Sequence, residues 1–410
     1  MYLLDQLLLK HGVEPSRFNE PAILPVSYLY AHDRNAFKII NELDLLGVGL
    51  EAYSKLKLGR KVLFFLDHYS PAPTPETAAL HAQQRAVAKA LGAPIFDEGS
   101  GVGHQLALET SVRPNDIAVG VDSHTCTVGA VGALGLRMPP VSVAAAMVSG
   151  TVEFYRPKII RIQLLNSLER PSTGKDVALF LAGLGPRRFA DALLEVGGPG
   201  LNSLELPDRI TLANLSTDLH ARSVLFEVDN VIVDSHNISD EHKTECSLDE
   251  YTDRVVVDLA QIPPFVARPG GIHNVVPLSE LRTRSRVDVV AVGSCTNGQF
   301  EDFVAFCNAL GNDRIAPHVR VIVTPTSGTV LKRLSSSGLL SKLIELGATI
   351  NPPGCGPCMG LHQGILSDGE ICVATGSRNT AGRMGSNKAE IYLVSPRTAG
   401  LAAIAGYIGH

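Results

Sequence analysis

The 410-residue chain contains no tryptophan, and aromatic residues make up only 5% of it. No uninterrupted apolar stretch is long enough to cross a bilayer, which argues against a membrane protein. The first ten residues have neither the basic start nor the long apolar core of a signal peptide, so we expect no export. Seven cysteines, an odd number in so long a chain, favour a reducing, cytoplasmic compartment over a disulfide framework.

Neither sign of charge is in large excess. The chain has 36 basic and 41 acidic residues, a formal net charge of -5, which argues against a nucleic-acid scaffold. Glycine (38) and proline (25) are plentiful and 45% of residues are hydrophobic, as in an α/β protein with many turns. The length exceeds one ordinary core, so two or three domains are expected.

Strand-like and helical patterns alternate along the chain. This alternation is typical of parallel sheets with crossover helices, and ligands of such sheets gather beyond the carboxyl ends of the strands. A Pro- and Gly-rich stretch at 261–277 is expected to connect two domains. We predict strands at 61–66, 116–121, 286–292 and 319–324, and helices at 75–91, 175–194, 300–310, 327–340 and 399–408, with a further tightly packed helix opening in the small-residue stretch 128–136.

Three cysteines lie in two glycine-flanked motifs, Gly-Ser-Cys-Thr-Asn at 293–297 and Gly-Cys-Gly-Pro-Cys at 354–358. The second motif alone would fit half a zinc site, a redox pair or structural thiols, but no second Cys-x-x-Cys completes a zinc site. Three thiolates can hold three irons of an iron–sulfur cube and leave the fourth iron open to a substrate. The remaining cysteines are expected in the core, and Cys372 in a buried strand.

Histidines and carboxylates occur together where predicted strands end. Asp67 precedes His68, and Asp122 shares a loop with His124, while His104 lies between them. An imidazole donates protons near neutral pH, and a carboxylate partner orients it. A single histidine is more often an ordinary loop residue, but three at strand ends in one region favour a site.

Two arginines, Arg378 and Arg383, flank a glycine-containing loop just downstream of the cysteine pair. Two guanidinium groups on one loop suit the binding of carboxylates, although surface arginines are the commoner case. Dehydration of a hydroxy acid needs a base, a proton donor and cations that hold carboxylates, and this set of residues could supply the last two.

Together these motifs resemble the aconitase superfamily, and within it the large subunits of the 3-isopropylmalate dehydratase and homoaconitase type. The resemblance extends from about residue 31 to the C-terminus, and several independent motifs in the right order make it specific. The matching segments are 67–68, 103–105, 122–127, 293–297 with 301–302, 353–358, 378–379 with 382–385, and 392–396.

The resemblance implies a three-domain α/β/α fold, with parallel sheets around a central cluster site, at residues 1–160, 161–265 and 266–410. It implies a 4Fe–4S cluster held by Cys295, Cys355 and Cys358. The implied activity is that of a hydro-lyase or isomerase in amino-acid biosynthesis, acting on a hydroxy di- or tricarboxylic acid such as 2-isopropylmalate, homocitrate or a substituted malate.

The resemblance also implies roles for single residues. His68, oriented by Asp67, resembles the acid that protonates the leaving hydroxyl. His104 is expected to pair with Asp122, and His124 with an acidic residue of the second domain, matched here by Asp218. The side chains expected to bind substrate are Arg378, Arg383, Ser123 and Asn214.

Family members also need a swivelling domain that carries the base serine and an arginine in a Gly-Ser-Ser-Arg-like loop. No such loop occurs in this sequence, so a separate small subunit is implied, and the chain alone is expected to be inactive. Asp218, His220 and Ser377 depart from the family's Glu, Gly and Asn, which leaves the substrate open. Two other hypotheses are an RNA-binding relative and a degenerate subunit that scaffolds a paralogue.

Overall fold

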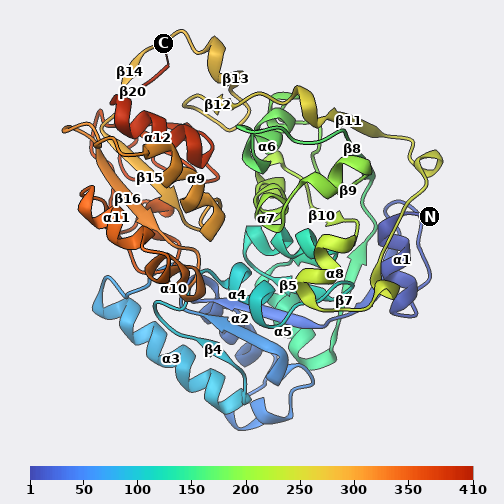
Figure 1. The fold of residues 1–410 in the computed structure, drawn as a ribbon. Helices are drawn as coiled ribbons and strands as arrows, with labels where there is room; N and C mark the ends of the chain where they lie inside the picture. Colours follow the sequence, from blue (N-terminus) through green and yellow to red (C-terminus); the bar gives the residue numbers. More distant parts are fainter. Residues whose placement is uncertain (410) are drawn as a thin grey trace.

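The structure is a computed structural model that describes residues 1–409, and it shows a mixed α/β chain with three larger sheets (Figure 1). The first sheet has the order β4-β3-β2-β5-β6, and all of its pairs are parallel. Its elements are β2 (Tyr28–His32), α2 (Asp33–Leu45), β3 (Val62–Phe65), α3 (Pro75–Leu91), β4 (Ile95–Phe96), α4 (Gly103–Thr110), β5 (Ile117–Gly120), β6 (Leu134–Arg137) and α5 (Pro140–Ser149).

The second sheet is also parallel, with the order β10-β9-β8-β11. It occupies the green region of Figure 1, with helices packed on it. Its elements are β8 (Ile159–Leu165), α6 (Gly174–Gly183), β9 (Leu193–Gly197), α7 (Leu206–Leu215), β10 (Ser223–Phe226), α8 (Asn230–His236) and β11 (Arg254–Asp258).

The third sheet has the order β13-β12-β19-β18-β15-β16-β17, with five parallel strands and an antiparallel edge of two. The antiparallel edge was not predicted, whereas the parallel strands were. Its elements are β12 (Phe265–Ala267), β13 (Val275–Pro277), β15 (Val289–Gly293), α9 (Phe300–Leu310), β16 (Arg320–Thr324), α10 (Gly328–Ser336), α11 (Leu339–Glu345), β17 (Thr349–Ile350), β18 (Ile371–Ala374), β19 (Glu390–Leu393) and α12 (Pro396–Ala405).

Short antiparallel pairs close the structure at its periphery. An N-terminal helix, α1 (Leu3–Lys10), precedes β1 (Pro21–Pro25), which pairs with β7 (Thr151–Tyr155), and β14 (Ser285–Arg286) pairs with β20 (Tyr407–Ile408). The largest buried apolar cluster draws on all three larger sheets, with Phe65, Ile162 and Leu393 among its members. The three sheets therefore share this cluster, while two further clusters lie mainly within the first and third sheets. Among the described helices, none is both long and apolar enough to cross a membrane.

Most predicted elements are present, and the helices predicted at 75–91 and 300–310 have the predicted bounds. Cys372 lies in β18 and is fully buried, as expected. The helix predicted at 327–340 is divided at Gly338, whose φ is +77°. The stretch 261–277 is more than a connection, because it contributes the strands β12 and β13. The final helix ends at Ala405, before Gly406 and β20.

Two further predictions of helix are wrong. The helix expected at 175–194 ends at Gly183, and its last residues begin β9. The stretch 128–136 forms the end of a 3-10 helix, Ser123–Val131, followed by β6. A Cβ on Gly129 would lie 2.0 Å from the carbonyl oxygen of Val224. A Cβ on Gly135 would lie 2.2 Å from the carbonyl oxygen of Thr125. The small residues there serve close backbone packing and not helix formation.

We expect Gly129→Ala to destabilise the chain strongly, because its Cβ would meet backbone that cannot move aside as a flexible side chain would. The expected loss in the free energy of unfolding is about 3 kcal/mol, measured by urea unfolding. Gly49→Ala is the matched control, since nothing lies within 4 Å of a Cβ there and its φ is −76°. Equal stability of the two variants would contradict the close packing of Gly129.

Candidate active site

Loops that follow strands of the first and third sheets meet over one cavity of about 280 Å³. Each loop leaves the carboxyl end of a strand, where the backbone turns and the side chains point away from the sheet. The predicted site residues that line this cavity are Asp67, His68, His104, Asp122, Ser123, His124, Cys295, Cys355, Arg378 and Arg383. The other three, Asn214, Asp218 and Cys358, lie directly behind it, each in contact with a lining residue.

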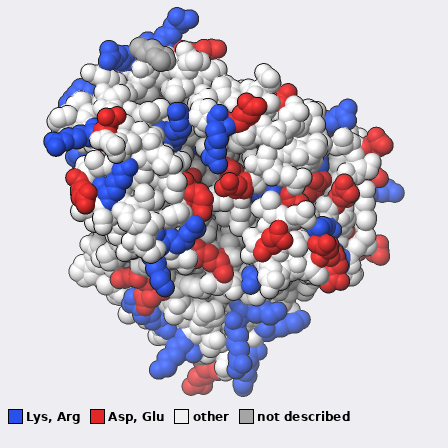
Figure 2. Space-filling view, viewed as in Figure 1, with Lys and Arg blue, Asp and Glu red and all other residues white. Residues whose placement is uncertain are grey.

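A larger hollow of about 860 Å³ lies between the starts of α6 and α7 on one side and the helices α9 and α12 on the other. None of the predicted site residues lines it. Figure 2 shows acidic and basic side chains interspersed over the two upper lobes, without a broad surface of one sign there. The smaller cavity is therefore the candidate site, because it alone gathers the predicted chemistry among the cavities of the described residues.

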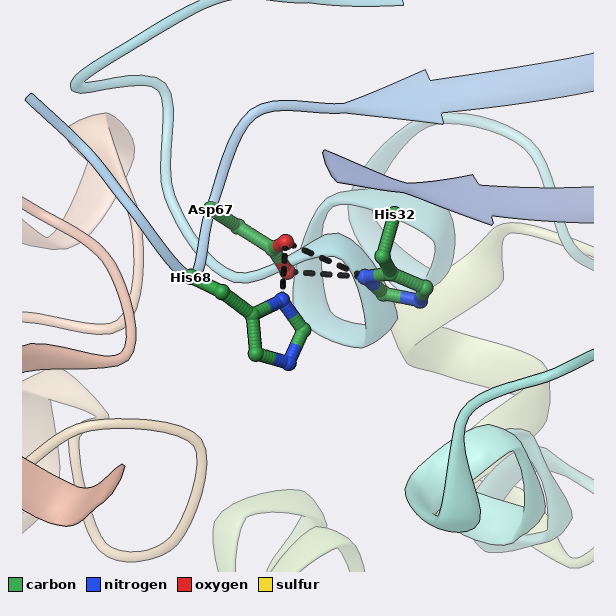
Figure 3. Close-up of side chains that lie close together, drawn as sticks. All are labelled: His32, Asp67 and His68. Atoms are coloured by element: carbon green, nitrogen blue, oxygen red, sulfur yellow. Dashed lines mark hydrogen bonds and ion pairs between the residues drawn. The ribbon is translucent and has the colours of Figure 1, made fainter. Parts of the chain in front are cut away.

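One carboxylate, that of Asp67, lies between two imidazoles (Figure 3). Nδ1 of His68 is 2.7 Å from its Oδ1, and Nδ1 of His32 is 2.9 Å from its Oδ2. Burial alone would raise the pKa of Asp67, but the charges of both imidazoles outweigh it and hold this pKa well below its usual range. Burial likewise opposes charge on His68, yet Asp67 and further carboxylates raise the pKa of His68 well above its usual value.

The carboxylate of Asp122 lies close to three histidines, His104, His124 and His68. Its Oδ1 is 3.0 Å from Nε2 of His104 and accepts a hydrogen bond of 2.8 Å from the backbone N–H of His124. Its Oδ2 is 3.6 Å from Nε2 of His68, which joins the two groups across the cavity. Burial lowers the pKa of His104 to about 4, so this imidazole is neutral at physiological pH.

The two arginines have different partners. Arg378 donates from Nε to Asp218 at 2.5 Å and from Nη2 to Oγ of Ser123 at 3.1 Å. Oδ2 of Asp218 also lies 3.5 Å from Nε2 of His124. The aspartate side chain, although shorter than that of glutamate, therefore reaches both Arg378 and His124. Arg383 lies beside the cysteine pair, with Nη2 at 3.4 Å from Sγ of Cys358.

The three motif cysteines fit an iron–sulfur cluster. All are free thiols, and Cys295 and Cys355 line the cavity. The hydrogen bond between the two thiols holds the pKa of Cys358 well below its usual value and, with burial, raises that of Cys355 well above it, so the pair shares one proton. The charge of Arg383 lowers the pKa of both thiols, which favours their ligating thiolate form. The buried Oγ of Ser294, next to Cys295, has no hydrogen-bond partner among the described residues, so it is available to a sulfur acceptor.

Some residues of the site escaped prediction from the sequence. His32 is the last residue of β2 and Asp33 the first of α2, close to the end of a strand as Asp67 and His68 are after β3, and this repeated position was the available signal. Asp33 accepts backbone hydrogen bonds from His68 at 3.1 Å and Tyr69 at 2.8 Å, and so shapes the loop that carries His68. The wholly buried Lys175 donates to the carbonyl oxygen of Thr375 at 2.9 Å, and no motif marked it.

Beside the first cysteine motif, burial raises the pKa of Asp302 to about 7. The carboxyl group of Asp302 then keeps its proton in the folded chain up to about pH 7, whereas the unfolded chain loses it near pH 4. The free energy of unfolding therefore falls as the pH rises from about 4 to about 7. We expect Asp302→Asn to remove this dependence, on the order of 3 kcal/mol between pH 4 and pH 8. Urea unfolding of both chains across this range tests it, and parallel pH curves would contradict it.

Comparison with known proteins shows the family of this chain. Residues 73–406 match the aconitase family (aconitate hydratase), so the chain belongs to that family. The class of enzyme, a hydro-lyase, is thereby confirmed together with the predicted family.

Two dehydratase large subunits are similar to the chain. The 3-isopropylmalate dehydratase large subunit 2 of Archaeoglobus fulgidus is 36% identical over 365 residues, or 88% of each chain. The 3-isopropylmalate dehydratase large subunit 1 of Thermotoga maritima is 33% identical, covering 99% of this chain and 97% of its own.

The homoaconitase large subunit of Thermus thermophilus is 36% identical, covering 99% of this chain and 96% of its own. Among solved structures, aconitase X of Thermococcus kodakaraensis in its holo-form aligns with a TM-score of 0.48 at 10% identity, over 92% of this chain and 89% of that one.

Proposed function

We propose that this chain is the large, catalytic subunit of a 4Fe–4S-dependent hydro-lyase that moves a hydroxyl between neighbouring carbons of a hydroxy di- or tricarboxylic acid. The observation that carries the proposal is the meeting of three kinds of group at one cavity: the motif thiols, the Asp67–His68 pair and the two arginines. The relatives named 3-isopropylmalate dehydratase and homoaconitase support the same substrate class.

In the proposed mechanism, Cys295, Cys355 and Cys358 would hold the cluster, which supplies a Lewis acid for the substrate hydroxyl when bound. Asp67 fixes Nδ1 of His68, which leaves Nε2 to hold the proton for the leaving hydroxyl. Because the pKa of His68 is raised well above its usual value, this proton stays on the imidazole through neutral pH. Asp67 and His68 are both buried, which strengthens the interaction between their charges.

The arginines would orient the substrate through its carboxylates. Because Asp218 and Ser123 already engage Nε and one Nη of Arg378, its other Nη is left for a substrate oxygen. Arg383 would hold a second carboxylate beside the cysteines. Asn214, whose Oδ1 accepts from Oγ1 of Thr296 at 2.7 Å, would fix the first cysteine loop and not the substrate directly.

We further propose three domains at 1–160, 161–265 and 266–410, each built on one of the larger sheets. The relatives are large subunits by name, and the sequence has no Gly-Ser-Ser-Arg loop. A separate small subunit would therefore bring the base serine and an arginine to the cavity.

The test is to purify the chain anaerobically, alone and with a candidate small subunit. Formation of the unsaturated acid from 2-isopropylmalate, homocitrate and citramalate is then followed by absorbance. We expect turnover of one substrate by the complex and none by the chain alone. Turnover by the chain alone would remove the need for a partner. An inactive complex with full iron content, which binds RNA once iron is removed, would favour the regulator hypothesis.

A further inference from the structure

We propose that His362 and Gln363 are positioning residues for His68: they hold the loop that carries this imidazole against the loop that carries the cysteine pair. The inference rests on the role proposed for His68 above. It adds two residues that neither the sequence motifs nor the lining of the cavity had marked.

The two loops belong to different sheets. The His68 loop (residues 66–74) follows β3 of the first sheet, and the cysteine loop (residues 351–370) follows β17 of the third sheet. Asp67 fixes the ring of His68 within its own loop, with Oδ1 at 2.7 Å from Nδ1, but not relative to the cysteines. Contacts between the loops are therefore needed to set the distance from the proton donor to the cysteine pair.

Two side chains of the cysteine loop donate to carbonyl oxygens of the His68 loop. Nε2 of His362 donates to the carbonyl oxygen of His68 at 2.7 Å, and Nε2 of Gln363 donates to that of Ser70 at 2.7 Å. We call these two hydrogen bonds the clamp. One of them fixes the peptide group of His68 itself, and the orientation of this peptide group sets the direction in which the imidazole leaves the backbone.

The backbones of the two loops also meet directly. The N–H of Cys355 donates to the carbonyl oxygen of Asp67 at 3.0 Å. A Cβ on Gly354 would lie 3.1 Å from the same oxygen, so the absence of a side chain there allows this close approach. A cysteine that lines the cavity is thus a direct neighbour of the residue that orients His68.

The N–H groups of the His68 loop are held from the other side. The carboxylate of Asp33 accepts from the backbone N–H of His68 at 3.1 Å and from that of Tyr69 at 2.8 Å. The first sheet thus supplies acceptors to this loop, and the cysteine loop supplies donors. Backbone groups that no sheet pairs are satisfied in this way, and the loop has one conformation.

The backbone of Gln363 is in an uncommon conformation. Its φ is +61°, in the left-handed region that favours glycine. Its carbonyl oxygen accepts a hydrogen bond of 3.1 Å from Nδ2 of Asn351, while its side chain reaches Ser70. A side chain at such a φ persists where surrounding contacts hold it, often beside a functional site. Glycine would suit the backbone of position 363 but could not supply the donor.

The first and third sheets have a second, separate contact. The N–H of Val102 donates to the carbonyl oxygen of Thr326 at 2.8 Å, and the N–H of Gly328 donates to that of Ser100 at 2.8 Å. These bonds hold the segment before α4 and not the His68 loop. Loss of the clamp is therefore expected to loosen that loop while the two sheets stay together.

The first test compares turnover of His362→Ala and His362→Gln in the iron-loaded complex. Alanine removes the donor to the carbonyl oxygen of His68, whereas glutamine can still donate an N–H. We expect kcat to fall about 10-fold in the alanine variant, with an unchanged KM, and to recover with glutamine. His318→Ala is the control, because His318 also donates to a backbone carbonyl, that of Gly406 at 3.2 Å, but does not line the cavity. A wild-type kcat in His362→Ala would overturn the proposal.

Combination with His68→Ala distinguishes positioning from a purely structural role. A residue that acts through His68 has nothing left to position once the imidazole is gone. The double variant His68→Ala/His362→Ala should therefore have the kcat of His68→Ala alone, with unchanged iron content and thermal unfolding. A further fall of kcat, or a loss of iron or stability in proportion to it, would show a structural role and overturn the proposal.

Hydrogen–deuterium exchange tests the clamp without any turnover. We expect the amides of His68 and Tyr69 to exchange about 5-fold faster in His362→Ala and in Gln363→Ala, which loses the other donor of the clamp. Unchanged exchange in the folded variants would overturn the proposal, and failure of both variants to fold would show a structural role instead. An inactive wild-type complex would refute the proposed function, whereas the exchange rates would still decide whether the clamp holds the His68 loop.

Discussion

Cys355→Ser is expected to abolish both the visible iron–sulfur absorption of the protein and its turnover. Cys355 is 8% exposed, lines the candidate cavity and belongs to the only Cys-x-x-Cys pair of the sequence. A serine oxygen is a harder ligand than a thiolate and is not ionised at neutral pH, so it holds an iron of the cluster poorly. Iron, sulfide and the visible spectrum of anaerobically reconstituted protein measure this loss.

Cys246→Ser is the control for that experiment. Cys246 is a free thiol at the edge of the second sheet, outside the candidate site, and we expect this variant to keep full iron and activity. The thermal unfolding of both variants shows whether the fold survives. An active Cys355→Ser enzyme with about four irons would remove Cys355 from the ligand set.

His68→Ala is expected to keep the cluster and to lose most turnover. General acid catalysis by one side chain is worth about 10²–10⁴-fold in rate, so kcat should fall by roughly that factor. The visible spectrum and iron content should stay as in wild type, because no thiol is touched. Turnover at the wild-type rate would exclude His68 from the mechanism.

The pH profile of wild type adds a second measurement on the same residue. The carboxylates around His68 raise its pKa well above the usual value, so it stays protonated through neutral pH. Dehydration, which consumes that proton, should hold constant through neutrality and fall only in the alkaline range. His68→Ala should lack this alkaline fall, and an identical fall in both enzymes would assign it to another group.

Local signals in the sequence were sufficient for several helices. Thr74 caps α3, Pro75 occupies its first turn and Gly92 ends it in the left-handed conformation, so the predicted bounds of 75–91 agree with the structure. In the stretch 128–136, Gly132 ends a 3-10 helix in the left-handed conformation, and the small residues around it do not indicate helix packing. Their role depends on the backbone of Val224 and Thr125, and the first of these is remote in sequence.

The sequence by itself also determined the family and the candidate chemistry, because the cysteine, histidine and arginine motifs are short, ordered and placed at strand ends. Three imidazole–carboxylate pairs, His68 with Asp67, His104 with Asp122 and His124 with Asp218, were already expected from the resemblance, but only the tertiary structure brought further partners to this network. It placed His32 opposite His68 on Asp67, and it joined Asp33 to His81 and Glu98. Such contacts link residues far apart in sequence, 94 positions for His124 and Asp218 and 51 for Gln84 and Asp33. The packing of parallel strands, and not local propensity, brings these residues together.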